Sequence, residues 1–313
     1  MYNASRAGWI GVDLGSRVAK LAQLERANGS LRLAAAAAVV RDTNASLRDD
    51  LRALRAVASR LRGHEAAATL SMSCCTLDAL TPEESPSRTD CRDAWSPVDS
   101  AVYQLGADAA RVEATAEAFT RAGVRCTTID GAPLALARAT EFDSETPGDE
   151  LVAVFDWGET AALLVGAVNG SAVYARRLGS GGFGEFRRAV AERVGLSPSD
   201  AEPLLIEPPA EPRELRLLRD AVRDASRETI EQARRSLEHL GAKLRRPTPP
   251  RLLVTGAASV APLCVQHLGE ALGVDAAPFR AGKLDRTQQP GAPPDSLLAQ
   301  AIALSALAWE SHS

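Results

Sequence analysis

Residues 9–16 read WIGVDLGS, an apolar run of strand length that ends in Asp-x-Gly and a polar residue. A second apolar run, VAKL at residues 18–21, follows directly. The glycine permits a tight turn between two strands, in which backbone N–H groups are exposed. A carboxylate beside such a turn can hold a hydrated Mg²⁺ ion, while the N–H groups receive phosphate oxygens. The stretch therefore predicts a strand–turn–strand element suited to a phosphate group.

The same pattern returns in the second half of the chain. Residues 151–160 read LVAVFDWGET, and the apolar run AALLV follows at 161–165. Around each copy the sequence predicts a three-stranded meander that contains an Asn-Gly hairpin turn. The duplication predicts two related α/β lobes, and two acid-tipped turns that face each other would form a nucleotide cleft. The predicted strands are 8–13, 17–25 and 30–40 in the first half, and 151–156, 160–168 and 171–178 in the second.

The composition is that of an ordinary soluble globular protein. The chain has 313 residues, 45% of them hydrophobic and 24% charged, with a formal net charge of −4. This charge argues against nucleic acid as a partner, because binding phosphate backbones needs concentrated Lys and Arg. No apolar stretch approaches the roughly 20 residues that span a bilayer. The five cysteines show no C-x-x-C spacing, and without a signal peptide we expect reduced thiols in the cytosol.

The rest of the chain alternates helical periodicity with turn-rich segments. Residues 66–80 predict one or two strands, and 124–129 and 251–255 predict one strand each. Residues 81–100 and 198–212, which are rich in proline, predict loops. The predicted helices are 47–62, 108–122, 183–194, 212–240, 259–272 and 296–309.

Taken in order, these stretches resemble the actin-like ATPase superfamily and, within it, the family of the type IV pilus assembly protein PilM. That family is related to the division protein FtsA and to the cytoplasmic part of the type II secretion L protein. Residues 10–21 look like its first phosphate motif, residues 155–160 are similar to the second, and residues 252–258 (LLVTGAA) resemble its adenosine motif. The stretches 122–130 and 272–279 narrow the resemblance to PilM, and it extends over nearly the whole chain.

The resemblance implies an α/β fold of the actin-like, ribonuclease H-like duplicated kind with two lobes. The first lobe would span residues 1–145, with a small subdomain inserted at about 64–128. The second lobe would span residues 146–313, with the C-terminal helix 296–309 returning to the hinge.

The resemblance also implies a site for ATP and Mg²⁺. Asp13 and Asp156 would contact Mg²⁺ through water; the alternative is that each Asp only stabilises its own turn. Lys20 shares an apolar strand face, where a charge needs a partner, and a phosphate would provide one. Its alternative is a lysine that extends to the sheet edge. The implied nucleotide-binding residues are Asp13, Gly15, Ser16, Lys20, Asp156, Gly158, Thr160, Gly256 and Ala257.

Three departures from the family pattern favour weak or absent ATP hydrolysis and a degenerate site. Arg17 stands where the family has a small polar residue. Glu159 places a carboxylate beside the second turn, where it would repel a γ-phosphate unless a metal ion intervenes. Ala257 adds a methyl group where a glycine would let the backbone approach the nucleoside closely.

The resemblance implies a function as a cytoplasmic scaffold of a type IV pilus or type II secretion-like assembly platform. It would bind the N-terminal peptide of a PilN-like inner-membrane protein, together with other pilus or secretion platform proteins. Such a protein would lie at the inner face of the inner membrane through these partners, without direct membrane insertion.

Two other functions stay open at this point: a phosphotransferase, and a filament-forming or membrane-tethered protein similar to FtsA. A sugar or acetate kinase-type phosphotransferase has the same fold, and its catalytic base would be Asp130. The stretch GSGGFG at residues 179–184 matches G-x-G-x-x-G, but it follows an Asn-Gly hairpin instead of opening a βαβ unit. We therefore expect no dinucleotide site there, and interpret the glycines as the bend into the next helix.

Overall fold

The computed structural model describes residues 6–42, 46–58, 60–80, 91–98, 101–146, 149–179, 181–286 and 291–310. They form two compact units. Unit 1 comprises Met1–Gly148, Asn169–Ala172 and Arg280–Ser313, and unit 2 comprises Asp149–Val168 and Val173–Phe279. The lobe boundary at 145/146 and the inserted subdomain at 64–128 stay predictions.

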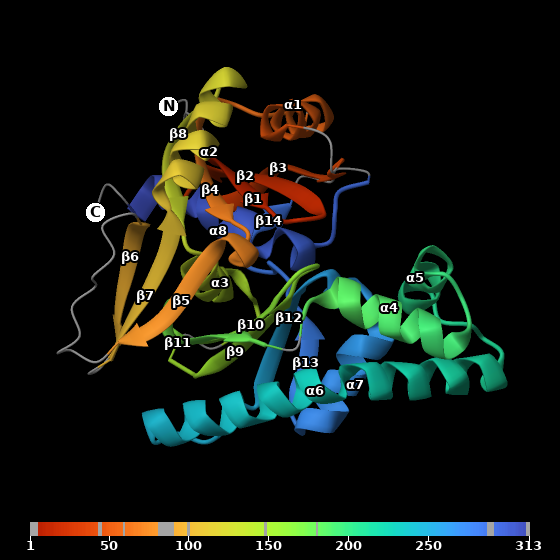
Figure 1. The fold of residues 1–313 in the computed structure, drawn as a ribbon. Helices are drawn as coiled ribbons and strands as arrows, with labels where there is room; N and C mark the ends of the chain where they lie inside the picture. Colours follow the sequence, from red (N-terminus) through yellow and green to blue (C-terminus); the bar gives the residue numbers. More distant parts are fainter. Residues whose placement is uncertain are drawn as a thin grey trace. The chain divides into compact units, whose positions relative to one another are not determined.

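Unit 1 is built on a six-stranded sheet in the order β14-β3-β2-β1-β4-β8 (Figure 1). The first three strands form the predicted antiparallel meander, and β4 and β8 extend it in parallel with β1. Asn28 and Gly29 turn the chain between β2 and β3 with φ of 52° and 83°, as a two-residue hairpin requires. The strands are β1 (Arg6–Leu14), β2 (Val18–Ala27), β3 (Ser30–Val40), β4 (Glu65–Leu70), β8 (Arg125–Asp130) and β14 (Asp285–Arg286).

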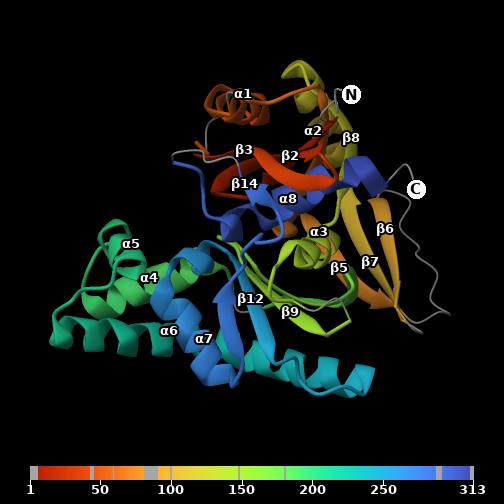
Figure 2. The same ribbon diagram turned by 180° about the vertical axis from the view of Figure 1, so that it is seen from behind.

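Helices cover both faces of this sheet, as Figures 1 and 2 show from opposite sides. On one face α1 (Leu47–Val57) and α2 (Ala109–Arg121) bury Leu54 and Phe119 against the strands. On the other face lies α8 (Asp295–Glu310), with α3 (Ala132–Ala139) packed beside it. α1 buries one apolar face against the sheet, whereas α8 is buried at nearly every position.

The remainder of unit 1 is a small sheet in the order β5-β7-β6. Its strands are β5 (Cys75–Leu80), β6 (Cys91–Val98) and β7 (Ala101–Asp108). The prediction of a loop over 81–100 is therefore wrong for β6, and residues 81–90 and 99–100 lie outside the described residues. Pro97 is compatible with β6 because β6 is an edge strand of this sheet.

Unit 2 contains a five-stranded sheet in the order β11-β10-β9-β12-β13. Its strands are β9 (Val152–Trp157), β10 (Ala162–Val168), β11 (Ser171–Leu178), β12 (Arg251–Gly256) and β13 (Asp275–Pro278). Asn169 and Gly170 form the predicted turn, with φ of 50° and 71°. The sheet repeats the plan of β3-β2-β1-β4 in unit 1, so the predicted duplication is confirmed.

The helices of unit 2 are α4 (Phe183–Val194), α5 (Pro198–Ile206), α6 (Pro212–Leu244) and α7 (Pro262–Leu272). The predicted loop at 198–212 is wrong over α5. Ser197 caps this helix by accepting from the backbone N–H of Asp200, and Pro198 occupies a first-turn position where its missing N–H costs nothing. Within the described part of the chain, we find no helix with the length and apolar character of a membrane span.

Candidate functional site

Four polar residues form one row across the unit 1 sheet. Lys20 on β2 pairs with Asp13 on β1, Asp13 pairs with Thr69 on β4, and Thr69 pairs with Asp130 on β8. Directly paired residues of neighbouring strands project from the same face of a sheet. The row lies near the carboxyl ends of β1, β4 and β8, where α/β sheets carry their ligands.

Asp13 and Lys20 form a largely buried ion pair. Lys20 Nζ lies 2.7 Å from Asp13 Oδ2, and the two side chains are 12% and 9% exposed. Lys20 was expected to need a partner on this apolar strand face, and the structure shows that the partner is Asp13. Any phosphate that used Lys20 would have to compete with this pair.

Thr69 is the residue of this row that the sequence analysis missed. Its side chain is fully buried, and its Oγ1 has no hydrogen-bond partner among the described residues. Asp13 Oδ1 also makes no hydrogen bond within the described part of the chain, but unlike Thr69 Oγ1 it is not fully buried. A buried oxygen without a partner indicates a water or ligand, because most buried polar atoms are hydrogen-bonded. The only sequence signal was a threonine within the strand EAAATL.

The turn between β1 and β2 needs glycine and is held from outside. A Cβ on Gly15 would lie 2.6 Å from the Val18 O and 3.0 Å from Lys20 Nζ. Arg41 donates from Nη1 to the Gly15 O at 2.9 Å, and its Nε lies 2.8 Å from Oδ2 of the buried Asp50 at the start of α1. Ser16 is exposed at the tip of the turn. Arg41 thereby fixes the predicted phosphate turn to α1.

Asp130 is engaged in structural contacts. Its Oδ1 accepts from the backbone N–H of Gly131 at 2.8 Å, and its Oδ2 lies 3.0 Å from Arg138 Nη1. Arg138 also lies 2.8 Å from Glu310 on α8. These contacts engage both carboxylate oxygens and argue against the role of catalytic base in a phosphotransferase.

In unit 2, Asp156 lies at the end of β9, next to the end of β12. Asp156 Oδ1 accepts from Thr255 Oγ1 at 2.9 Å. Gly256, which follows Thr255, has a φ of 73°, and a Cβ at this position would lie 2.7 Å from Asp156 Oδ1. Ala257 opens the short 3₁₀ helix Ala257–Val260 and is half-buried. The second phosphate motif and the adenosine motif therefore meet through Asp156 and Gly256.

We expect Gly256→Ala to destabilise unit 2 by about 1–3 kcal/mol and to displace the Asp156 carboxylate. The alanine would have to adopt a left-handed φ, and its methyl group would press on the short Asp156 side chain. Urea unfolding measures the first effect. Gly195→Ala is the matched control, since Gly195 also has a positive φ, 73°, but open space around its missing Cβ. Equal losses in the two variants would show that backbone strain alone accounts for the effect.

The second turn, residues 158–160, is closed on itself and packed under the glycine-rich stretch. The Gly158 N–H donates to the Ala161 O at 3.0 Å, and the Gly184 N–H donates to the Glu159 O at 3.0 Å. A Cβ on Gly182 would overlap the Glu159 O. Thr160 is exposed. Gly182 and Gly184 therefore permit close packing against this turn. The described residues of the stretch follow the neighbouring strands β10 and β11, which are antiparallel hairpin strands and not part of a βαβ unit.

Glu159 is neutralised within unit 2. Its Oε1 accepts from Arg187 Nη2 at 2.9 Å, and Arg187 Nη1 lies 3.3 Å from Glu202 Oε2 on α5. The Arg187 side chain is 12% exposed and that of Glu159 is 20% exposed. The repulsion of phosphate expected from Glu159 is thus offset by a partner on α4, which sequence reasoning missed because 27 residues separate the two in the chain.

The structure places the predicted residues in two sets. Unit 1 brings Asp13, Gly15, Ser16 and Lys20 to one hairpin, and unit 2 brings Asp156, Gly158, Thr160, Gly256 and Ala257 to the ends of β9 and β12. No group of three or more His, Cys, Asp or Glu side chains in the described ranges could hold a metal ion directly. Of the carboxylate oxygens in this row of unit 1, Asp13 Oδ1 makes no hydrogen bond within the described residues, and a Mg²⁺ ion that used it alone would keep most of its ligands as water.

No protein-family model matches the chain, and no curated protein matches it in sequence. Solved structures do match it along nearly its whole length. A structure of a PilM–PilN type IV pilus biogenesis complex aligns with a TM-score of 0.77 and 19% identity over 96% of this chain and 98% of the other.

Two further structures align less closely. The ethanolamine utilization protein EutJ from Carboxydothermus hydrogenoformans gives a TM-score of 0.58 and 15% identity over 96% of this chain and 89% of its own. The activator of 2-hydroxyisocaproyl-CoA dehydratase from Clostridium difficile, with bound ADPNP, gives a TM-score of 0.52 and 11% identity over 97% of this chain and 95% of its own. The protein therefore has the actin-like ATPase fold, in a form similar to that of PilM.

Proposed function

We propose that this protein is an actin-like scaffold of a type IV pilus or a related secretion platform, and that it binds the N-terminal tail of a PilN-like membrane protein. The observation that carries the proposal is the likeness to the PilM–PilN structure over 96% of this chain. Its TM-score of 0.77 exceeds the 0.58 and 0.52 of the EutJ and activator structures. The scaffold would lie in the cytoplasm and reach the inner membrane through its partner.

Mg²⁺–ATP belongs to the same proposal, as a ligand that is hydrolysed slowly or not at all. When bound, the nucleotide would supply a polyphosphate and a hydrated cation. Asp13 would orient water on the cation, and Lys20 would exchange its contact with Asp13 for one with a phosphate oxygen. Asp130 and Glu159 already have arginine partners, so neither is available as a general base.

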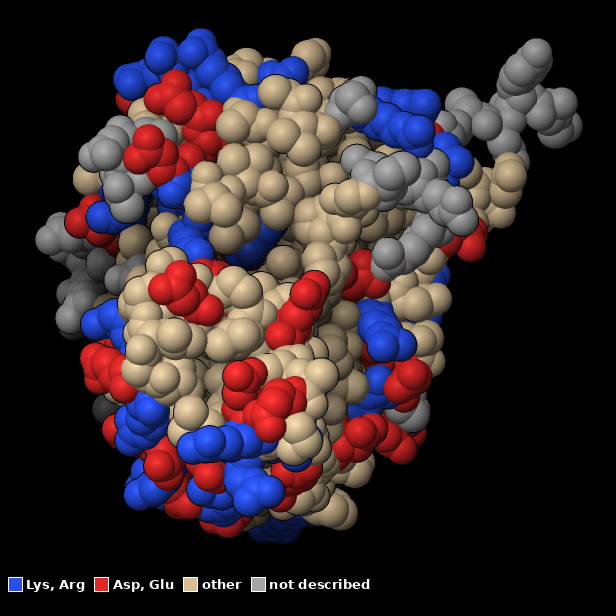
Figure 3. Space-filling model, turned by 90° about the vertical axis from the view of Figure 1, so that its right-hand side faces the viewer, with Lys and Arg blue, Asp and Glu red and all other residues tan. Residues whose placement is uncertain are grey.

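The distribution of surface charge in Figure 3 is relevant to whether nucleic acid is a partner. On the face that it shows, blue Lys and Arg side chains are interspersed with red Asp and Glu side chains. Such a mixture favours contact with a protein surface over contact with a polyphosphate backbone. That nucleic acid is not a partner stays a prediction.

The decisive experiment is a titration of the full chain with a synthetic peptide of the N-terminal tail of the PilN-like protein encoded in the same genome. We expect saturable heat at micromolar peptide, and tighter binding with Mg²⁺–ATP present, since a ligand that favours one state shifts the population toward it. A scrambled peptide is the control. Heats equal to those of the scrambled peptide, with and without nucleotide, would exclude the scaffold role, and phosphoryl transfer to a sugar or acetate would replace it with a kinase.

A further inference from the structure

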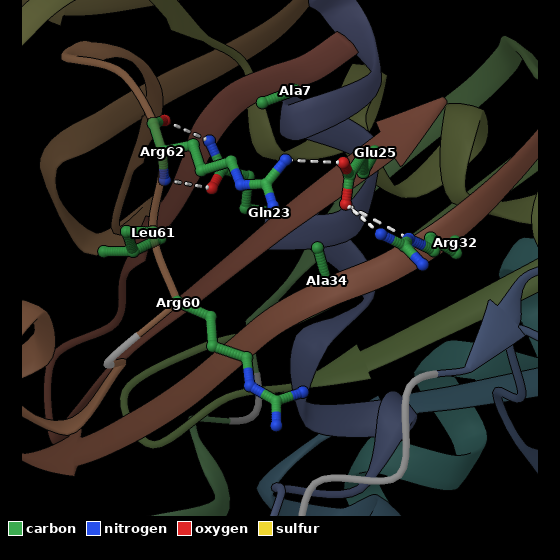
Figure 4. Close-up of a pocket in the computed structure, with 8 residues that line it drawn as sticks. All are labelled: Ala7, Gln23, Glu25, Arg32, Ala34, Arg60, Leu61 and Arg62. Carbon is green, nitrogen blue, oxygen red and sulfur yellow. Dashed lines mark hydrogen bonds and ion pairs between the residues drawn. The ribbon is translucent and has the colours of Figure 1, made fainter. Parts of the chain in front are cut away.

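Unit 1 carries a pocket at the end of its sheet that the nucleotide proposal does not use. It has a volume of roughly 520 Å³ and is shown in Figure 4. Strands β1, β2 and β3 supply Ala7, Gln23, Glu25, Arg32 and Ala34, and the segment after α1 supplies Arg60, Leu61 and Arg62.

This pocket is distinct from the row that contains Asp13. Gln23 and Glu25 follow Leu21 on β2, and Leu21 belongs to the core beneath α1, whereas Lys20 projects from the opposite face. Glu25 is five residues along the strand from Lys20, which corresponds to about 17 Å. A ligand in the pocket would therefore leave the Asp13–Lys20 pair in place.

One wall of the pocket is fixed by Gln23. This buried carboxamide donates from Nε2 to the Gly8 O at 2.9 Å and to the Arg62 O at 2.6 Å. Its Oε1 accepts from the Arg62 N–H at 2.8 Å. Gln23 thus ties the backbone of the segment after α1 to the sheet, and the wall is preorganised.

Glu25 holds two of the three arginines. Its Oε2 accepts from Arg32 Nε at 3.1 Å and from Arg32 Nη2 at 2.7 Å, and its Oε1 accepts from Arg62 Nη1 at 2.8 Å. The carboxylate is only 3% exposed, while the Arg32 and Arg62 side chains are 40% and 61% exposed. Figure 4 shows both guanidinium groups converging on Glu25.

Arg60 supplies the third guanidinium. It makes no hydrogen bond or ion pair with any residue in the described part of the chain, and Figure 4 draws it without a dashed line. The pocket lining thus carries three arginines against one carboxylate, a balance of +2. A cluster of guanidinium groups with one carboxylate is short of negative charge, and its planar donors match carboxylate and phosphate oxygens.

We propose that this pocket binds a small organic anion through a phosphate or carboxylate group, with Arg60 as its principal contact and Arg32 as the second. Its volume falls in the range of small-molecule sites. Glu25 and Gln23 position the arginines and the wall, and they do not contact the anion. The inference is independent of the pilus role and of the nucleotide.

Calorimetric titrations of the full chain with sodium phosphate and with sodium citrate, at constant ionic strength, test this proposal and distinguish the two anion classes. We expect one saturable site, and a loss of about tenfold in affinity on Arg60→Ala, equal to roughly 1.4 kcal/mol. Arg60→Ala should fold normally because the side chain makes no hydrogen bond or ion pair within the described residues. Arg121→Ala is the matched control: it removes an equal charge from an exposed helical pair with Glu117 on the same unit.

The place where the anion binds is tested by the Lys20→Met variant and by the side-chain NH₂ signals of Gln23 in a ¹⁵N spectrum. The proposal expects Lys20→Met to bind as the wild type does and the Gln23 signals to shift on titration. Binding that disappears in Lys20→Met but survives Arg60→Ala would place the anion at the β1–β2 turn and overturn the proposal. An equal loss in Arg121→Ala, or no saturable heat with either anion, would also overturn it.

Discussion

Gly11→Ala is expected to lower the free energy of unfolding by about 3 kcal/mol, the upper end of the typical range for overpacking a core. A Cβ on Gly11 would overlap the backbone O of Ala301 on α8 and lie 2.7 Å from the Ser305 N. Both neighbours are helix backbone, so no side chain can move aside. The helix would have to shift away from β1, and it is buried along most of its length.

The measurement is urea denaturation of Gly11→Ala beside Gly179→Ala. Gly179 has ordinary φ, and the nearest atoms to a Cβ there belong to Gln232 at 3.8 and 3.9 Å. The same exchange should therefore change stability by less than about 0.5 kcal/mol, as at most surface positions. A Gly11→Ala variant that unfolds at the wild-type urea concentration would show that α8 does not pack this closely on β1.

The duplicated architecture could be predicted because its signals are local. Asn28-Gly29 and Asn169-Gly170 both adopt the positive φ that a two-residue hairpin needs. The Asp-x-Gly turns likewise end strands β1 and β9. Each of these features depends on a few neighbouring residues, so the sequence alone contains the necessary information.

Elements that depend on distant partners could not be predicted in the same way. β6 contains Arg92, Asp93 and Pro97, and it forms a strand because β7 pairs with it throughout its length. α5 has Pro203 inside it, and its apolar residues Ala201 and Leu205 are buried. Tertiary packing overrides local propensity in both segments.

The same distinction applies to the candidate site. Asp13 and Asp156 were predicted from the turns that carry them. Thr69 lies beside Asp13 only because β1 and β4 pair in parallel register. Arg187 reaches Glu159 only because α4 packs against the turn at residues 158–160. Both contacts join residues that are far apart in the chain, so no short stretch of sequence predicts either one.

The Asp13–Lys20 pair leads to the prediction with the largest expected effect on ligand binding. We expect Lys20→Met to weaken binding of Mg²⁺–ATP by at least about tenfold, because a charge-assisted hydrogen bond to a phosphate contributes roughly 1.5–3 kcal/mol. The same substitution leaves the Asp13 carboxylate, 9% exposed, without its ion pair, so stability should fall by about 2 kcal/mol. Calorimetry and urea denaturation measure the two effects on one sample.

The double variant Asp13→Asn with Lys20→Met separates structure from ligand binding. It removes both charges, so stability should return to within about 1 kcal/mol of the wild type, since a buried pair contributes little beyond compensating for its own desolvation. Nucleotide affinity should stay low, because neither the carboxylate for the hydrated cation nor the ammonium for the phosphate is restored. If instead the double variant binds Mg²⁺–ATP as tightly as the wild type, the pair serves only to hold the β1–β2 hairpin, and the nucleotide role assigned to both residues is wrong.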